Sequence, residues 1–307
     1  MNWLNSLVVM LMPLAPKPLV QRFARRYVAG EHLDEALGIV RRFNTEGALC
    51  TVDYLGEFIQ DKAQAEEALA TYKNILDAIA AEGLSANVSV KPTQMGLLLD
   101  KNFCYENLRT LIAYADSKNN FVRVEMEDSQ CTSDTLEIYL QLRREFKNCG
   151  IVLQAYLRRT LGDAREVLAA RAGNFRLCKG IYAEPRAVAF KDHALINKNY
   201  VLILEEMLKA GAYVGIATHN EELVWEAMRL IDKYQIRNNP YEFQQYEFQM
   251  LLGVEPELRQ IILNAGHRLR VYIPYGKHWH AYSLRRFKEN PAMVGHILKN
   301  ISLFSMR

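Results

Sequence analysis

The sequence lacks the glycine-rich signatures that mark several common enzyme folds. It contains no G-x-G-x-x-G, no G-x-x-x-x-G-K-[ST] and no G-x-S-x-G. In that order, these motifs belong to dinucleotide-binding doubly wound domains, to phosphate-binding loops and to the nucleophile elbow of serine hydrolases. A nicotinamide-dependent doubly wound enzyme, a phosphoryl transferase and an elbow-serine hydrolase therefore have no support in the sequence.

Cysteine is scarce and shows no pairing pattern. The chain has 5 cysteines in 307 residues, and none of them forms a C-x-x-C pair. Disulfide frameworks need an even number of cysteines, and metal-binding or redox cysteines are usually closely spaced. We therefore expect free, buried thiols in a reducing compartment, the cytoplasm.

Neither sign of charge dominates the composition. The chain carries 38 basic and 35 acidic residues, a formal net charge of +3, and the two kinds are interspersed. A nucleic-acid-binding surface normally carries a clear basic excess gathered on one face. No nucleic-acid partner is therefore expected.

No apolar run is long enough to span a bilayer. The candidate at the N-terminus lacks a preceding positive charge and is interrupted by Pro13, Pro16 and Pro18. It is too short for a membrane span and wrongly flanked for a secretory signal. Two interpretations stay open: an arm packed on the main body, or peripheral contact with the inner face of the cell membrane. Basic residues suited to the second interpretation follow the run: Lys17, Arg22, Arg25 and Arg26.

Short apolar runs rich in β-branched residues alternate with amphipathic segments along the rest of the chain. The runs are GALCTV, SANVSV, FVRVEM, GIVLQAY, NFRLC, AYVGIAT, EFQMLLG and RLRVYIP, with helices predicted over 62–81, 134–146, 186–208 and 221–234. Eight strand-helix units predict an α/β fold, a closed parallel β/α barrel of the TIM type. No linker interrupts it, so we expect a helical arm over 1–44 and one barrel domain over 45–307.

Polar side chains fall where the predicted strands end. Active sites of such barrels lie at the carboxyl ends of the strands, and a random distribution would place polar residues at both ends. The residues concerned are Lys91, Glu125, Glu127, Asp128, Gln154, Arg176, Lys179, Thr218, His219, Tyr272 and Tyr275.

Two adjacent arginines follow the last predicted strand. If a helix begins near residue 277, then Tyr282, Arg285, Arg286 and Glu289 share one helical face. Two neighbouring guanidiniums favour a planar carboxylate ligand, and Glu289 is placed to pair with either of them. The competing interpretation is a solvated basic stripe.

Several other candidates remain open to more than one interpretation. Lys91 and Lys179 each suit a strand-end lysine reaching for water, a carboxylate contact or a Schiff base. His219 suits a helix cap, a core partner or a cofactor contact. A metal site is not expected, because Glu125 and Glu127 would converge without a histidine partner. The residues alone indicate a barrel enzyme that handles a small carboxylate.

Taken together, the quoted segments resemble the proline dehydrogenase family. The likeness runs in order through TVDYLGE, VSVKPTQMG, RVEMEDS, IVLQAYLRRT, RLCKGIYAEP, ATHN, YEFQMLLGV and RVYIPYGKHWHAYSLRRFKEN, nearly the whole barrel. The resemblance implies a distorted eightfold barrel, bound FAD, and oxidation of L-proline to 1-pyrroline-5-carboxylate with electrons passed to a quinone. Because the chain ends soon after the arginines, we expect a monofunctional enzyme whose product goes to a separate pyrroline-5-carboxylate dehydrogenase.

The resemblance also implies a role for individual residues. Glu125 and Arg176 would be catalytic, with Arg176 near the reactive nitrogen of the flavin. Lys91, Arg285 and Arg286 would hold the substrate carboxylate, and Glu289 would pair with the arginines. Leu251, Tyr272 and Tyr282 would enclose the proline ring. The remaining cofactor contacts would be Met126, Gln154, Lys179, Gly180, Ile181, Thr218, His219 and Asn220.

Two positions depart from the family pattern. Glu125 stands where aspartate is usual, and Ile181 where a small alanine is usual. The first change leaves the role of this carboxylate less defined, and the second adds bulk beside the flavin. Two other classes therefore stay open: a lysine-dependent aldolase using Lys91 or Lys179, and a catalytically silent barrel that binds an amino acid.

Overall fold

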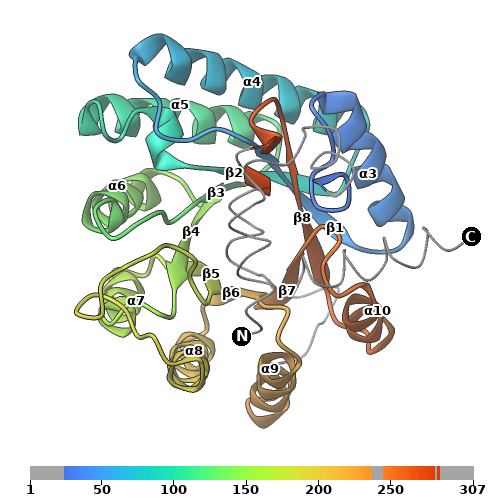
Figure 1. Ribbon diagram of the computed structural model, residues 1–307, viewed down its shortest axis with the longest axis vertical. Coiled ribbons are helices and arrows are strands. Elements are labelled where there is room, and N and C mark those ends of the chain that lie inside the picture. The colour runs from blue at the N-terminus through green and yellow to red at the C-terminus, as the bar shows by residue number, and fades with distance from the viewer. Residues whose placement is uncertain (1–23, 237–244, 281, 284–307) are drawn as a thin grey trace, which may run out of the picture.

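Eight parallel strands close into a barrel in sequence order (Figure 1). The computed structural model describes residues 24–236, 245–280 and 282–283. Each strand pairs in parallel with the next, and β1 pairs with β8 to close the ring. The strands are β1 (Leu49–Tyr54), β2 (Ala86–Val90), β3 (Val122–Val124), β4 (Cys149–Gln154), β5 (Asn174–Cys178), β6 (Tyr213–Ala217), β7 (Tyr246–Leu251) and β8 (Leu269–Tyr275). The predicted β/α barrel is confirmed.

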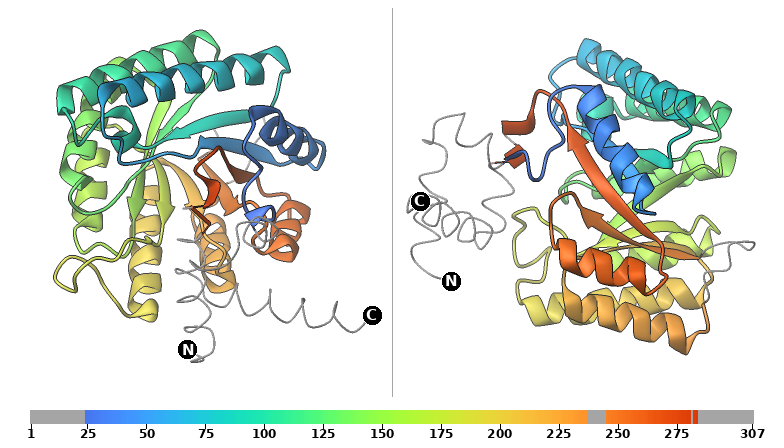
Figure 2. Two further views of the ribbon diagram at one scale, coloured as in Figure 1. Left: turned by 45° about the horizontal axis from the view of Figure 1, so that its top comes forward. Right: turned by 90° about the vertical axis from the view of Figure 1, so that its right-hand side faces the viewer.

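Helices surround the barrel on its outer face (Figures 1 and 2). They are α3 (Leu33–Thr45), α4 (Lys62–Ala81), α5 (Lys101–Ser117), α6 (Thr132–Glu145), α7 (Thr160–Ala169), α8 (His193–Lys209), α9 (Glu221–Lys233) and α10 (Pro256–Asn264), with a short 3₁₀ helix η2 (Pro92–Met95) after β2. The helix predicted over 62–81 matches α4, while those over 134–146 and 221–234 match α6 and α9 within two residues.

The helix predicted over 186–208 begins later than expected. Asp192 caps α8 by accepting a hydrogen bond from the backbone N–H of Leu195, at 2.8 Å. The preceding residues form an irregular loop, in which Ala189 makes an isolated antiparallel bridge with Leu157. A side-chain cap satisfies an N–H group that has no partner at a helix start, so the first helical residue is His193.

The strands present apolar side chains to the helices and polar side chains to the barrel interior. Neighbouring residues on a strand face opposite sides. Val88 and Phe248 are at most 1% exposed and belong to the apolar core. By contrast, Arg176 on β5 donates a hydrogen bond to Ser89 on β2, a contact between strands that are not neighbours, so it crosses the interior. The polar side chains of the interior, such as Arg176, also contact residues at the carboxyl ends of the strands, such as Glu125 after β3.

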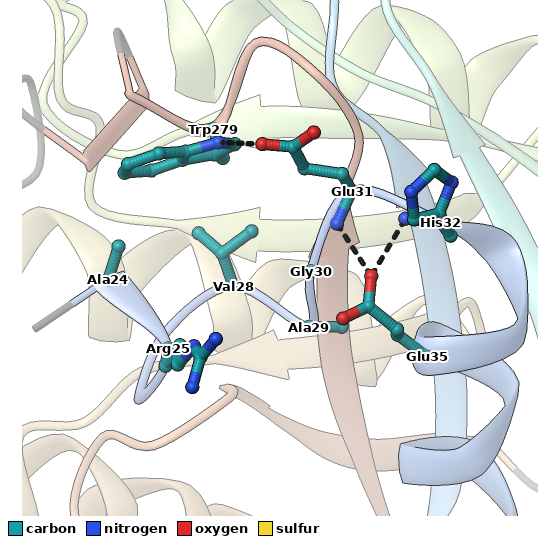
Figure 3. A pocket seen from close by; sticks show the side chains of 9 residues that line it. All are labelled: Ala24, Arg25, Val28, Ala29, Gly30, Glu31, His32, Glu35 and Trp279. Carbon is teal, nitrogen blue, oxygen red and sulfur yellow. Dashed lines mark hydrogen bonds between the residues drawn. The ribbon is translucent and has the colours of Figure 1, made fainter. Parts of the chain in front are cut away.

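The segment before α3 is tied to the end of β8 (Figure 3). The N–H of Ala29 donates to the carbonyl oxygen of Pro274 at 2.8 Å. The indole N–H of Trp279 donates to Glu31 Oε1 at 2.7 Å. Glu35 accepts from the backbone N–H groups of Glu31 and His32, which caps α3. Residues 24–45 thus contact the barrel, and the proposed division at residue 44 stays a prediction.

Residues 1–23, on which the two interpretations of the apolar N-terminus depend, lie outside the described part of the chain. Among the helices that the structure does describe, none is both long enough and apolar enough to cross a membrane.

Candidate active site

One cavity of about 450 Å³ lies at the carboxyl ends of the barrel strands. Its volume is in the range of small-molecule sites, roughly 300–1,000 Å³. Every predicted site residue within the described ranges contributes to its lining: Lys91, Glu125, Met126, Gln154, Arg176, Lys179, Gly180, Ile181, Thr218, His219, Asn220, Leu251, Tyr272 and Tyr282. The fold therefore gathers these residues at one place, while their individual roles stay predictions.

Three predicted residues, Arg285, Arg286 and Glu289, lie outside the described residues. After β8 the chain becomes helical at Trp279, close to the predicted start near residue 277. Tyr282 belongs to this helical stretch, is 6% exposed and lines the cavity. The expected common face of Tyr282 and the two arginines stays a prediction.

Lys91 directly follows β2 and forms a buried ion pair with β1. Its Nζ donates to both carboxylate oxygens of Asp53, at 3.0 Å each. Burial alone would lower the pKa of Lys91, but the carboxylates of Asp53 and Glu125 raise it above its ordinary value. Lys91 therefore carries a fixed positive charge at the cavity. The interpretation of a strand-end lysine reaching for water is wrong, because the residue is only 7% exposed.

Arg176 occupies the middle of the barrel mouth and joins several strands. Its Nε–H donates to Gln249 Oε1 on β7 at 2.5 Å, and one terminal nitrogen donates to Ser89 and to Glu125. The guanidinium carbon lies 5.1 Å from the ring centroid of Tyr272 on β8, within the range of a cation–π contact. Its planar group is thus held in a defined orientation beside the cavity.

Glu125 is ionised and accepts hydrogen bonds at one oxygen from Ser89 and Arg176. Burial would raise the pKa of its carboxyl, but the positive charges of Arg176 and Lys91 hold that pKa below its ordinary value. A carboxylate with a lowered pKa is a weak base. Its visible contacts are therefore those of an anion that orients Arg176.

Glu127 does not converge with Glu125, contrary to the expectation from strand alternation. Strand β3 ends at Val124, so the alternation no longer applies to these residues. Glu127 instead accepts from the backbone N–H and hydroxyl of Thr93, at 2.8 and 2.6 Å. Burial raises the pKa of Glu127 to about 7. Within the described ranges, no three His, Cys, Asp or Glu side chains are grouped as a metal site would require.

Gly180 brings the backbone close to the cavity after β5. Its φ is +105°, a conformation that side chains disfavour. A Cβ atom at this position would lie 2.0 Å from a ring carbon of Tyr156. The backbone therefore rests against the Tyr156 ring, and only glycine fits there.

Thr218, His219 and Asn220 directly follow β6; Thr218 and His219, predicted to end the strand, lie just beyond it. Asn220 caps α9 by accepting from the N–H of Leu223 at 3.0 Å. The Nε2 atom of His219 accepts from the N–H of Leu251 at 2.8 Å. An accepting Nε2 requires a neutral imidazole with its proton on Nδ1. Of the interpretations for His219, the cap role belongs to Asn220, whereas the histidine links the ends of β6 and β7.

Lys179 and Ile181 flank Gly180 just beyond β5, so Lys179 lies after the strand and not on it. Burial lowers the pKa of Lys179 below its ordinary value. Ile181 is 39% exposed at the cavity lining. Its bulk therefore stands at the edge of the cavity and not in its buried part.

The sequence-based prediction missed Asp53, Ser89 and Gln249. Each one contacts a predicted residue: Asp53 contacts Lys91, while the other two contact Arg176. A usable signal was present, since Asp53 is the acidic residue of the apolar run CTVDY, and Glu247 and Gln249 alternate with Phe248 and Met250. Polar residues at alternate positions of a barrel strand indicate a polar interior face.

Comparison with known proteins agrees with this geometry. A family model described as proline dehydrogenase matches residues 36–298. This chain belongs to the proline dehydrogenase family. Proline dehydrogenase 1 of Bacillus subtilis (strain 168) is 36% identical over 278 residues, which cover 91% of this chain and 90% of the relative. The proline dehydrogenase of Deinococcus radiodurans is 34% identical over 304 residues, which cover 95% and 96% of the two chains.

Longer members of the proline dehydrogenase family share the barrel. The crystal structure of proline utilization A (PutA) from Bdellovibrio bacteriovorus, inactivated by N-propargylglycine, matches with a TM-score of 0.81 at 26% identity. The match covers 88% of this chain and 33% of that one, so this chain spans about a third of the PutA structure. As a member of the family, the chain is an oxidoreductase.

Proposed function

We propose that this chain oxidises L-proline to 1-pyrroline-5-carboxylate with bound FAD and passes the electrons to a quinone. Family membership supports proline oxidation as the reaction class. The observation that carries the proposal is the composition of one cavity. The fixed cation of Lys91 lies on its β2 side, Gly180 and Thr218 lie on its β5 and β6 side, and Arg176 spans the barrel between them.

The substrate half of the cavity suits a small cyclic amino acid. Lys91 offers a permanent positive charge to a carboxylate, because Asp53 keeps it protonated. Tyr272, Tyr282 and Leu251 supply apolar and aromatic surface for a saturated ring. Arg285 and Arg286 would complete the carboxylate site, as the sequence predicts. Holding the substrate at both ends fixes its reacting carbon and excludes water.

The cofactor half suits a flavin. Gly180 and four residues with polar side chains, Gln154, Lys179, Thr218 and Asn220, line this part of the cavity. Backbone and polar side chains along one part of a cavity suit a planar, polar ring system. FAD, when bound, supplies the two-electron acceptor that no side chain provides. Arg176, placed with its charge beside the cavity, would favour electron density arriving there.

The electron acceptor and the fate of the product complete the proposal. The quinone acceptor agrees with the family resemblance. The product would pass to a separate pyrroline-5-carboxylate dehydrogenase, as the family resemblance implies. The proposed location is the cytoplasm, with peripheral contact at the inner face of the cell membrane through the N-terminal residues.

The visible absorption spectrum of the purified protein, recorded anaerobically before and after adding L-proline, tests the cofactor and the reaction together. The proposal expects a yellow protein whose flavin bands bleach with L-proline and not with D-proline. A colourless protein, or flavin bands that L-proline leaves unchanged, contradicts it and favours the binding barrel.

Borohydride trapping tests the aldolase alternative. A Schiff base needs a neutral lysine amine. Asp53 keeps Lys91 charged, but burial lowers the pKa of Lys179, so Lys179 is the residue to monitor. L-proline has no aldehyde or ketone carbonyl group, so the probe is a small 2-keto acid such as pyruvate. With pyruvate and borohydride, no covalent adduct on Lys179 is expected by mass spectrometry. An adduct there that is absent from a Lys179→Arg control would favour the aldolase.

A further inference from the structure

A continuous chain of buried polar side chains runs from Arg176 into the barrel. Arg176 donates through Nε to Gln249 Oε1 at 2.5 Å, and Gln249 Nε2 donates to Glu247 Oε1 at 2.6 Å. The carboxylate of Glu247 also accepts from Nε and from a terminal nitrogen of Arg270, at 2.5 and 3.1 Å. Gln249 thus joins the cavity arginine on β5 to a buried ion pair between β7 and β8.

The chemistry of the neighbours fixes the orientation of the Gln249 amide. Its carbonyl oxygen faces the guanidinium of Arg176, and its NH₂ group faces the carboxylate of Glu247. The opposite orientation would place NH₂ against a donor and oxygen against an anion, which loses both hydrogen bonds. Glu247 is fully buried, and the positive charge of Arg270 keeps it ionised although burial opposes this, so its pKa lies below the ordinary value.

Gly215 makes room for this side chain. On β6 it pairs in register with Arg176 on one side and with Glu247 on the other. A Cβ atom at Gly215 would lie 2.4 Å from Nε2 of Gln249. Gly215 does not have a positive φ, so the space above it, and not a special backbone conformation, accounts for the glycine.

The two hydrogen bonds of Gln249, here called the link, are not needed to balance the charge of either ion pair. Glu247 already has a two-point contact with Arg270, and Arg176 already has Glu125 as its anionic partner. What Gln249 adds is a second fixed point on the guanidinium of Arg176, at Nε. With Nε and one terminal nitrogen held, the plane of the group is set. Within the described residues, the other terminal nitrogen of Arg176 has no hydrogen bond to protein, so its donors are available to a ligand.

We propose that Gln249 is a positioning residue that orients Arg176 toward the bound cofactor, and that Gly215 provides the space it occupies. This inference rests on the proposed function. The consequence is that loosening the link weakens the stabilisation of the reduced flavin and slows the chemical step, with little effect on proline binding. A merely structural role would change the stability of the fold alone.

The test compares three variants of the holoenzyme. Gln249→Leu removes both hydrogen bonds at similar volume, and Gly215→Ala displaces the amide while leaving Gln249 in the chain. Tyr139→Phe is the matched control, because it removes the buried hydrogen bonds of its hydroxyl to the carbonyls of Ala172 and Asn174, at 2.6 and 3.4 Å, and Tyr139 does not line the cavity. For each variant we would measure FAD content, melting temperature, the flavin midpoint potential, kcat and KM.

Both link variants are expected to retain FAD and to destabilise the reduced flavin about tenfold, a fall of about 30 mV for a two-electron couple. Their kcat should fall about tenfold and KM should change less than twofold. The double variant should be no worse than Gln249→Leu alone, because both substitutions act through the same amide. Tyr139→Phe should change only the melting temperature.

Two results would overturn the inference in different ways. If wild-type flavin bleaches with L-proline but the potential and kcat of both link variants equal those of Tyr139→Phe, Gln249 is structural and the proposed function stands. If wild-type protein holds no flavin or does not bleach, the proposed function fails and the inference fails with it. Should Gln249→Leu not fold, Gly215→Ala alone decides between these results.

Discussion

The ammonium group of Lys91 lies 3.0 Å from both carboxylate oxygens of Asp53, and both side chains are buried at the barrel mouth. A symmetric pair of this kind holds the lysine charged and immobile before any substrate arrives. It also means that neither charge is tolerable without the other, because an isolated buried ion is strongly destabilising.

Asp53→Asn is therefore expected to lower the free energy of unfolding by about 3–5 kcal/mol, because it removes the only carboxylate that is hydrogen-bonded to Lys91 within the described residues. Urea denaturation of the variant and the wild type measures this difference. The double variant Asp53→Asn, Lys91→Met removes both charges and should recover part of the loss. A loss below about 1 kcal/mol in the single variant would show that water or another group replaces Asp53.

Glu125→Asp is expected to remain active, with kcat/KM within about tenfold of wild type, since it keeps the anion beside Arg176 and shortens the side chain by one methylene. Glu125→Gln should cost more, about 1.5–3 kcal/mol of transition-state stabilisation, because Arg176 loses its anionic partner although the amide oxygen can still accept a hydrogen bond. Steady-state kinetics on both variants compares the effect of side-chain length, in Glu125→Asp, with the effect of charge, in Glu125→Gln. An inactive aspartate variant beside an active glutamine variant would contradict this ranking.

Glu127 should make the fold less stable as pH rises through the mildly acidic range. Its folded pKa is raised to about 7, so between the ordinary glutamate pKa and about 7 the folded state binds a proton that the unfolded state has lost. The free energy of unfolding attributable to Glu127 therefore falls with increasing pH, by on the order of 3 kcal/mol over that range.

Glu127→Gln should flatten this pH dependence, because its amide can accept from the N–H of Thr93 and donate to the hydroxyl without a charge. Urea denaturation of both proteins at a series of pH values between 5 and 8 gives the comparison. Parallel curves for the two proteins would show that Glu127 does not titrate there.

Gly180→Ala is expected to reduce FAD retention, since the new methyl group would collide with Tyr156 and push the backbone into the cavity. The ratio of flavin absorbance to protein absorbance after purification measures retention. Gly162→Ala is a suitable control, because a Cβ atom there meets nothing within 4 Å and the backbone is helical. Equal flavin content in the two variants would show that FAD binding does not depend on the position of the backbone at Gly180.

Arg286→Lys should weaken the binding of L-proline by on the order of 2 kcal/mol and so raise its KM. Lysine cannot form the two parallel hydrogen bonds that a guanidinium makes with a carboxylate. This expectation comes from the sequence, since Arg286 lies outside the described residues. Kinetics with L-proline measures it, and Arg268→Lys, on the loop before β8, serves as a control. Unchanged kinetics for Arg286→Lys would contradict a two-arginine clamp.

The barrel was predictable because its signal is local and repeated. Each strand is a short β-branched run such as ANVSV, and each helix has its own amphipathic pattern, as α4 shows. The start of α8 was not predictable in the same way, because residues 186–192 have helical composition but Asp192 ends the loop by capping. Alternation also failed for Glu127, because strand β3 ends three residues before it.

The sequence by itself determined the fold class and the residues that gather at the barrel mouth, since strand ends in a parallel barrel meet at one face whatever the details of packing. Only the tertiary structure decided which side chains meet one another. Asp53 and Lys91 are 38 residues apart, and Arg176 and Gln249 are 73 apart, so no local pattern encodes either pair. The first pair depends on the parallel pairing of β1 with β2, and the second on the curvature of the ring, which brings β7 within reach of β5 across the space above Gly215.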